Sequence, residues 1–510
     1  MSASTKKKLR RAEREAGIDK KAEAAKAAAE KKAKTNRRWS LVAAGVALLV
    51  VVAIVLGTSL PFKATAYTVG NEKFSAAEVN YQYGAQYNAF VNQYGSYASL
   101  FGLDTSTGVV GLGDQLCYMT DDGGSWRDYF LNAAKEAMIQ STALNDYAAA
   151  NGIVLTEDEK AAVEGYFYGI NELAYTYGYA NADQFFSASY GNGVDFKMVL
   201  DGYMDSALCS KVVEQVTDSY SYTEAELEEQ YQSYEGAQDI FNYVYYFVAA
   251  ETEGEDAVVT EATLADAKAK ADDIVKAYKA AKGDDAAAKF DEALASVVPE
   301  AVATEQNIAG SSIIAANEWM LDAKRANGDI TSEVNSSETG YYVVVFLNRD
   351  DNHYNMANVR HILVKAVANE NGEYTEEAKQ TAKAHAEDLL KEFLAGDKSE
   401  ESFAAMANQY SEDGGSNTIG GLYENIAKGQ MVEEFEQFCF EGHKPGDTAI
   451  VYGESSAYAG YHVMYYVGEG MQYSDYIADT ELRSADLYAW LAEIMADYKV
   501  SEGFGMRLVG

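Results

Sequence analysis

Two hydrophobic periodicities alternate along the chain and predict a mixed α+β protein. After Ser75, a residue type that caps helices, apolar side chains recur every three or four positions, as on one face of a helix. These side chains are Val79, Tyr83, Tyr87, Phe90 and Tyr94. The same spacing predicts further helices near 127–150, 156–176, 182–189 and 194–217. With Thr223 as the candidate cap of another helix, we expect residues 61–238 to form a mostly helical domain.

The second half of the chain contains an internal repeat. Segments 327–351 and 445–470 each have a Gly-Asp turn, a strand, a loop and a strand that begins Gly-Tyr. An aromatic helix precedes each segment, and upstream of it lie a strand (240–249 or 358–367) and an Ala/Lys/Glu-rich helix. We therefore predict two α+β units, each a small antiparallel sheet with surrounding helices: copy one, 239–352, and copy two, 353–469.

The two copies differ in their histidines, of which the chain has five. Copy two has His361 in its first strand and His462 in its last, where copy one has Tyr342. A single histidine in a strand is readily explained as a hydrogen-bonded core residue. The first and last strands of a small antiparallel sheet can be neighbours, however, which would bring the two imidazoles together. Such a pair favours a functional site over simple packing.

An uncharged stretch of 24 residues lies between Arg38 and Lys63. At 1.5 Å per residue it is long enough to cross a hydrocarbon core of about 30 Å. A cleaved signal peptide is the alternative, although its apolar region is typically only about 7–15 residues long. We predict a single transmembrane signal anchor over 39–60, preceded by a basic tail, 1–38, that stays in the cytoplasm. The rest of the protein would then be extracytoplasmic and held at the cell membrane.

Charge and cysteine content narrow the classes of partner and cofactor. Residues 1–38 hold 14 Lys+Arg and five acidic residues, so this tail has a net charge of +9. Because the net charge of the whole chain is −38, the remaining residues carry −47. Such an acidic body would repel nucleic acid. The chain has three cysteines, Cys117, Cys209 and Cys439, and none has a partner at the spacing of metal ligands. Two alternatives stay open: buried free thiols, or a disulfide between Cys117 and Cys209. No cofactor or metal site is predicted.

Several linked motifs in copy two resemble the parvulin family of peptidyl-prolyl cis/trans isomerases. They are "VRHILVKA", "FAAMANQYSEDGGSNTIGGLYENIAKGQMVEEFEQFCF", "PGD" and "GYHVMYYV", in the order of the family. The organisation of the exported body is similar to that of SurA/PrsA-type foldases. That resemblance implies a helical chaperone domain over 61–238, completed by a C-terminal helix within 470–510. Copy one, without the histidines, would be a degenerate parvulin-like domain.

The resemblance also implies roles for individual residues. A polar catalytic cluster is expected from His361, Asp413 and His462. Substrate-binding positions are expected at Tyr423, Met431, Phe435 and Phe440, of which Met431 and Phe435 would form the wall of the proline pocket. Two residues depart from the family pattern: Glu424 replaces a usual glycine and Ile426 replaces a usual aromatic residue. These departures bear on pocket shape and turnover more than on the fold.

The chemistry of prolyl isomerisation fits such a set of residues. Rotation about a peptide bond faces a barrier of about 18–20 kcal/mol and breaks no bond, so it needs neither a nucleophile nor a metal. The expected partners are unfolded or newly exported proteins with X–Pro bonds. Lys365 is followed by the acidic run "AVANENGEYTEE", so a phosphorylated substrate is not expected.

Three functional hypotheses stay open at the level of sequence. The leading one is a membrane-anchored foldase with one active isomerase domain. The alternative is a non-enzymatic holdase that uses both parvulin-like units as binding modules. A third is a surface adhesion or solute-binding protein. Independently of these, the apolar stripe of the C-terminal helix, which includes Trp490, is predicted to pack on the helices of 61–238.

Overall fold

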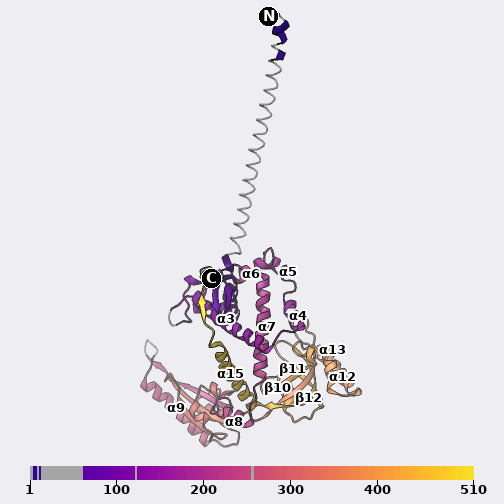
Figure 1. Cartoon of the computed structure of the whole chain (residues 1–510). Coiled ribbons are helices and arrows are strands. Elements are labelled where there is room, and N and C mark those ends of the chain that lie inside the picture. The colour runs from indigo at the N-terminus through magenta and orange to yellow at the C-terminus, as the bar shows by residue number, and fades with distance from the viewer. Residues whose placement is uncertain (1–3, 9–10, 13–60, 121–122, 254–257) are drawn as a thin grey trace. The chain divides into compact units, whose positions relative to one another are not determined.

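The computed structural model of the chain describes residues 4–8, 11–12, 61–120, 123–253 and 258–510 (Figure 1). The predicted transmembrane segment, 39–60, lies outside these residues. Among the helices of the described part, none is long and apolar enough to cross a membrane. The chain divides into two compact units, one of Met1–Tyr220 with Asp486–Gly510 and the other of Ser221–Ala485.

The first unit begins with a short antiparallel sheet that leads into a long helix. Strand β1 (Thr65–Val69) lies between β2 (Glu72–Ser75) and β13 (Val500–Glu502), so both ends of the unit meet in one sheet. Ser75 caps α2 (Ala76–Tyr94): its hydroxyl accepts a hydrogen bond from the Glu78 amide, and the Glu78 carboxylate accepts one from the Ser75 amide. The predicted cap is confirmed, whereas β13 was not predicted.

Five further helices follow in the first unit. They are α3 (Trp126–Asn151), α4 (Glu157–Tyr166), α5 (Ile170–Thr176), α6 (Ala182–Tyr190) and α7 (Phe196–Asp218). The prediction of one helix over 156–176 is wrong, because the chain turns at Gly169, whose φ is +77°. Next to this turn, Phe167 is buried against Phe186. The burial of this aromatic side chain stabilises the break in the helix.

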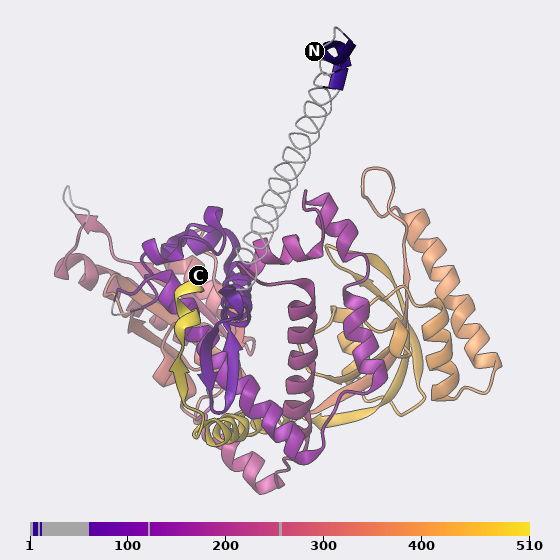
Figure 2. The same cartoon turned by 45° about the horizontal axis from the view of Figure 1, so that its top comes forward.

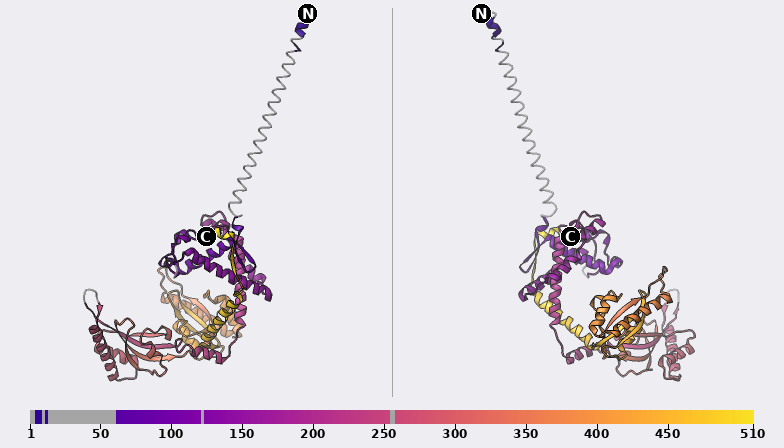
Figure 3. Two further views of the ribbon diagram at one scale, coloured as in Figure 1. Left: turned by 60° about the vertical axis from the view of Figure 1, so that its left-hand side comes forward. Right: turned by 90° about the vertical axis from the view of Figure 1, so that its right-hand side faces the viewer.

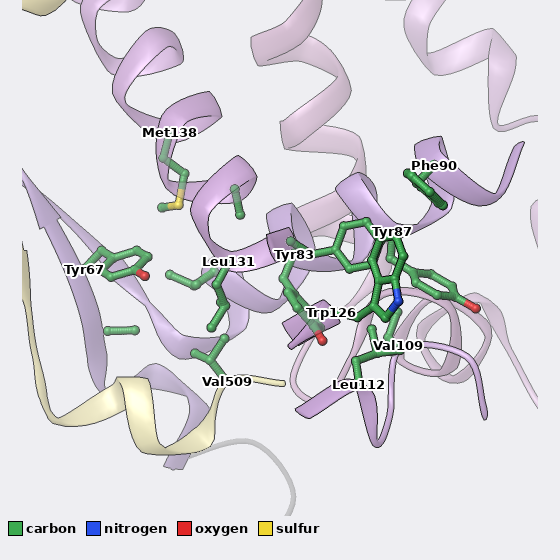
Figure 4. Close-up of a cluster of buried hydrophobic side chains, with 14 of the residues drawn as sticks. Tyr67, Tyr83, Tyr87, Phe90, Val109, Leu112, Trp126, Leu131, Met138 and Val509 are labelled. Atoms are coloured by element: carbon green, nitrogen blue, oxygen red, sulfur yellow. The ribbon is translucent and has the colours of Figure 1, made fainter. Parts of the chain in front are cut away.

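An aromatic cluster forms the main core of the first unit (Figure 4). Trp126 stacks on Phe130 with ring centroids 5.3 Å apart, and Tyr83 and Phe90 approach Phe130 edge-on. Val509, near the C-terminus, is buried in the same cluster. Each fully buried large side chain contributes roughly 1.5–3 kcal/mol, so the last residues of the chain are part of the core and not a loose tail.

The C-terminal helix confirms its predicted packing. Helix α15 (Tyr473–Met495) crosses the boundary between the units at residues 485 and 486. On its later part, Trp490 meets Tyr147 of α3 edge-on, with centroids 5.1 Å apart, in a cluster that includes Leu144 and Val212. The apolar stripe predicted from the sequence therefore packs against helices of the first unit.

In the second unit, copy one has a four-stranded antiparallel sheet in the order β6-β3-β8-β7. Figure 3 shows this copy from two further sides. Its strands are β3 (Ile240–Ala249), β6 (Thr304–Ala309), β7 (Ile330–Val334) and β8 (Gly340–Asp350). Helices α9 (Glu261–Ala280) and α10 (Ala286–Val297) cover one face, and α11 (Asn317–Leu321) packs on the other. Helix α8 (Glu224–Gln232) precedes the sheet, and β4 (Thr252–Glu253) and β5 (Val258–Val259) form a small ribbon.

Copy two repeats this arrangement with the sheet order β10-β9-β12-β11. Its strands are β9 (Asn355–Lys365), β10 (Leu422–Ile426), β11 (Thr448–Glu454) and β12 (Ala459–Gln472). Helices α12 (Glu376–Ala395) and α13 (Glu400–Tyr410) cover one face (Figure 2), and α14 (Glu433–Phe440) covers the other. The matching strand orders confirm the internal repeat.

Candidate active site

The two histidines of copy two lie together on one face of its sheet. Strands β9 and β12 are neighbours, with His361 opposite Met464 and His462 opposite Leu363. Because both histidines point to the same face, their Nδ1 atoms come within 2.9 Å and their rings stack with centroids 5.1 Å apart. Each residue is only 3% exposed. The predicted meeting of the first and last strands thus places a buried imidazole pair in the domain.

Asp413, in the loop after α13, lies at one end of the imidazole pair. Its Oδ2 is 3.0 Å from His361 Nε2, and it accepts further hydrogen bonds from the hydroxyls of Ser416 (2.6 Å) and Tyr423 (3.0 Å). The hydrogen bond from His361 is the main cause that holds the pKa of the Asp413 carboxyl well below its usual range, and Ser416 and the Gly415 amide add to it. Asp413 is therefore a carboxylate at neutral pH.

Tyr458, in the turn before β12, lies at the other end of the pair, with its hydroxyl 3.0 Å from His462 Nε2. Burial and the neighbouring His361 lower the pKa of His462 to about 3, so this imidazole is neutral at physiological pH. These contacts join the four side chains into one chain. The Tyr458 hydroxyl meets His462 Nε2, the two Nδ1 atoms meet each other, and His361 Nε2–H donates to the Asp413 carboxylate.

Aromatic residues enclose this polar chain. Phe435 on α14 is 2% exposed and meets both imidazoles edge-on, with centroids 5.4 Å from His361 and 5.2 Å from His462. The ring of Tyr423 lies 5.3 Å from His361. Met431 and Phe440 are half-buried against the same apolar cluster as Phe435, and Phe440 also meets Tyr354, with ring centroids 5.7 Å apart. Of the four predicted substrate-binding residues, Tyr423 and Phe435 directly border the histidine pair.

The two departures from the family pattern fall at an irregularity in β10. The pairing of β10 with β9 shifts between Tyr423 and Ile426. Glu424 is exposed in this bulge, and Asn425 adopts φ +54° with its amide bound to the side chain of Asn358. Ile426 is 1% exposed in the apolar cluster with Phe435. The side chain of Glu424 is therefore exposed to solvent, and that of Ile426 is part of the hydrophobic core.

Sequence reasoning missed three residues of the site. Ser416 and Tyr458 complete the hydrogen-bonded chain, and Gly453 on β11 makes room for it. A Cβ on Gly453 would lie 2.6 Å from His462 Nε2 and 3.0 Å from the Tyr458 hydroxyl. The spacing of Ser416 three residues after Asp413 was an available signal, since short polar residues commonly bond each other across such turns.

The described residues offer no alternative metal or disulfide chemistry. Among them, no group of three or more His, Cys, Asp or Glu side chains is placed to hold a metal ion. The three cysteines are thiols, so the Cys117–Cys209 disulfide left open by the sequence is absent. Burial raises the pKa of the Cys209 and Cys439 thiols to about 12, which makes both poor nucleophiles.

Comparison with known proteins identifies the domain that carries this site. Residues 333–465 match the family model of the PPIC-type PPIase domain, a stretch that includes all seven predicted site residues. A Bacillus cereus protein, foldase protein PrsA 3, is 42% identical over 64 residues, which are 12% of this chain and 21% of that protein. The chain therefore contains a peptidyl-prolyl cis/trans isomerase domain of the parvulin type.

Solved structures of similar proteins were also found. The chain is similar to the peptidylprolyl isomerase PrsA of Bacillus anthracis, with 21% identity and a TM-score of 0.18 over 29% of this chain and 59% of that chain. It is also similar to PrsA of Bacillus subtilis, with 13% identity and a TM-score of 0.22 over 74% of this chain and 88% of that chain.

Proposed function

We propose that this protein is a membrane-anchored extracytoplasmic foldase that isomerises X–Pro bonds in newly exported proteins. The observation that carries the proposal is the buried His361–His462 pair, linked to Asp413 and bordered by Phe435. The uncharged stretch that includes the predicted anchor, 39–60, and the asymmetry of charge around it support the location. The N-terminus would be cytoplasmic, with the acidic bulk on the other side of the membrane.

The site can lower the rotational barrier without covalent chemistry. A proline ring gripped by the apolar side of the site, at Phe435 and Met431, fixes one end of the amide that must rotate. The imidazole floor is neutral at His462, and the negative charge of Asp413 is compensated by three donors. On binding, the carbonyl of the substrate's X–Pro bond exchanges water for a fixed and weakly polar surface. This surface favours the twisted amide, because the twisted form has less charge separation than the planar one.

A protease-coupled prolyl-peptide assay on the full chain tests this proposal. We expect activity in the wild type and a loss of about tenfold or more in His462→Ala, which removes a hydrogen-bond partner from both His361 and Tyr458. His385→Ala is the matched control, because His385 is exposed on α12. Melting curves separate loss of activity from loss of folding. Equal activity in both variants would show that the imidazole pair has no part in catalysis.

The charge near the first strand supports a substrate without phosphate. Glu412 accepts a hydrogen bond from the Lys365 amide, and acidic residues follow Lys365 in the sequence. A phosphorylated residue before the proline would meet negative charge on this side. We expect unphosphorylated peptides to be the better substrates in the same assay, and nucleic acid is not a partner in this proposal.

A second candidate function, the holdase, is favoured by one observation. Copy one keeps the strand order of copy two, but it has Tyr342 at the position of His462. A domain that retains this fold without the imidazole pair can bind clients but has no equivalent polar chain. We therefore expect the double variant His361→Ala/His462→Ala to keep no isomerase activity, while suppression of client aggregation persists.

A further inference from the structure

The sheet register shows which residues of copy one replace the histidine pair. In copy two, His462 pairs with Leu363 and His361 lies two residues before Leu363 on β9. In copy one, Tyr342 pairs with Phe247, and Tyr245 lies two residues before Phe247 on β3. The closing strands align at Gly460 and Gly340, which each begin the Gly-Tyr motif. Tyr245 and Tyr342 therefore stand where His361 and His462 stand in copy two.

These residues form an aromatic surface, which we name the tyrosine face and define as Tyr245, Phe247 and Tyr342. The rings of Tyr245 and Tyr342 have centroids 5.7 Å apart, and those of Phe247 and Tyr342 are 4.7 Å apart. All three residues are only partly buried. Beside them, Tyr243 is fully buried, and its hydroxyl has no hydrogen-bond partner among the described residues.

Two carboxylates accompany the tyrosine face. Glu333 on β7 pairs directly with Tyr342, so both side chains project on the same face of the sheet. Burial and the nearby charge of Glu318 on α11 raise the pKa of Glu333. Within the described part of the chain, neither glutamate forms an ion pair with a lysine, arginine or histidine. Two like charges close together at partly exposed aromatic rings are an unfavourable combination that a cation would relieve.

We propose that the tyrosine face binds lysine or arginine side chains within extended segments of client polypeptides. Ring faces attract a guanidinium or ammonium group, and Glu333 and Glu318 supply the opposite charge. A second copy of this chain is an unsuitable occupant, because residues 39–510 carry −47 and would repel one another. This inference goes beyond the isomerase function and does not depend on activity in copy two.

Peptide binding to the full chain, followed by fluorescence anisotropy, tests the inference. The probe is a labelled, unstructured peptide that carries arginine residues and no proline, so that a proline-binding site contributes nothing. A matched peptide has glutamine in place of each arginine. We expect the arginine peptide to bind more tightly, and Glu333→Gln to weaken its binding by about three- to tenfold without changing the glutamine peptide.

The control for overall charge is Glu305→Gln. Glu305 lies on β6 of the same sheet and pairs with Val244, whose side chain belongs to the cluster on the opposite face. If Glu305→Gln and Glu333→Gln weaken arginine-peptide binding equally, the attraction comes from net charge and the inference is wrong. Equal affinity of the wild type for both peptides would also overturn it.

Variants of the ring test the aromatic contribution. Tyr342→Phe keeps the ring and should bind the arginine peptide within about twofold of the wild type, whereas Tyr342→Ala should weaken binding by about three- to tenfold. If Tyr342→Ala fails to fold, Glu333→Gln still decides the question, since it changes one charge on a partly exposed strand. Isomerase activity, measured in parallel, should be unchanged in Glu333→Gln, which separates this inference from the proposal for copy two.

Discussion

The protonation of His462 links the candidate site to the stability of its domain. The folded-state pKa is lowered to about 3 from an ordinary value of 6.5, because burial and His361 disfavour the imidazolium. Between these two values the unfolded chain binds a proton that the folded chain does not, so stability rises with pH in this window. The lowered pKa of Asp413 acts in the same direction below about pH 4, where this carboxyl becomes protonated in the unfolded chain but stays ionised beside His361 in the folded one.

We therefore predict that copy two loses stability as pH falls from about 6 to about 4, by up to about 1.4 kcal/mol per pH unit from His462 alone. Hydrogen exchange of the β12 amides measures the free energy of opening in this domain. In His462→Ala the slope should be flatter, and in His385→Ala it should equal that of the wild type. Parallel slopes in all three proteins would contradict the neutral, buried state of His462.

A single glycine gives a second prediction at the residue scale. In Gly453→Ala the new methyl group would lie 2.6 Å from His462 Nε2, so the ring must shift away from Tyr458. We expect isomerase activity to fall by about tenfold, at a cost of about 1–3 kcal/mol in stability from overpacking. Gly396→Ala in the same domain is the control, because its Cβ would make only an ordinary contact of 3.4 Å. Wild-type activity in Gly453→Ala would show that the Tyr458–His462 contact is dispensable.

The sequence predicted part of this site for a definite reason. His361 and His462 were found because each departs from the matching position in copy one, and a difference between repeats is visible without a structure. Ser416 and Tyr458 were not found, because their partners depend on how two loops close over the sheet. Loop conformation is set by contacts distant in sequence, which local periodicity does not encode.

At the scale of elements, periodicity located strands better than breaks in helices. The strand at 240–249 was predicted with its observed bounds, because two buried faces and aromatic side chains mark it strongly. The break between α4 and α5 was missed, because helical spacing continues through Gly169 and the decisive factor is the burial of Phe167. The predicted boundary at residue 238 also differs from the division at residue 220, since α8 supplies Tyr231 as a hydrogen-bond donor to buried Asp239 of the second unit.

The contact of α15 with the first unit gives a prediction at this scale. Trp490 packs edge-on against Tyr147 beside Leu144 and Val212, so Trp490→Ala removes a large apolar contact. Because Trp490 is only partly buried, we expect a loss of about 2 kcal/mol, below the range for a fully buried tryptophan. Tyr488→Ala on the same helix should have little effect, since Tyr488 is 73% exposed. Chemical denaturation, monitored through the tyrosine signal of the first unit's core, measures the stability of both variants. Equal effects of the two substitutions would place the stabilising contact elsewhere.

At the scale of the whole molecule, charge divides the chain into two parts of opposite sign. In the proposed topology, the +9 of residues 1–38 would be attracted to an anionic cytoplasmic membrane surface, and the −47 of the remainder would be repelled by anionic lipid headgroups. By the same argument, the acidic body would favour clients that carry basic residues, in agreement with the charge proposed for the tyrosine face. Net charge would then act on both location and client choice, while the tyrosine face also requires the sheet register that brings Glu333 beside Tyr342.

The last prediction concerns the anchor itself. If residues 39–60 span the membrane and are retained, the full chain should stay in the membrane pellet after an alkaline carbonate wash, and its deletion variant lacking 39–60 should not. Protease added outside the cell should digest the body, while an epitope placed before residue 38 should be accessible only after lysis, because the basic flank stays in the cytoplasm. Mass spectrometry of the mature N-terminus provides the decisive control. A soluble product that begins near residue 60 would show a cleaved signal peptide, and the foldase would then act unanchored.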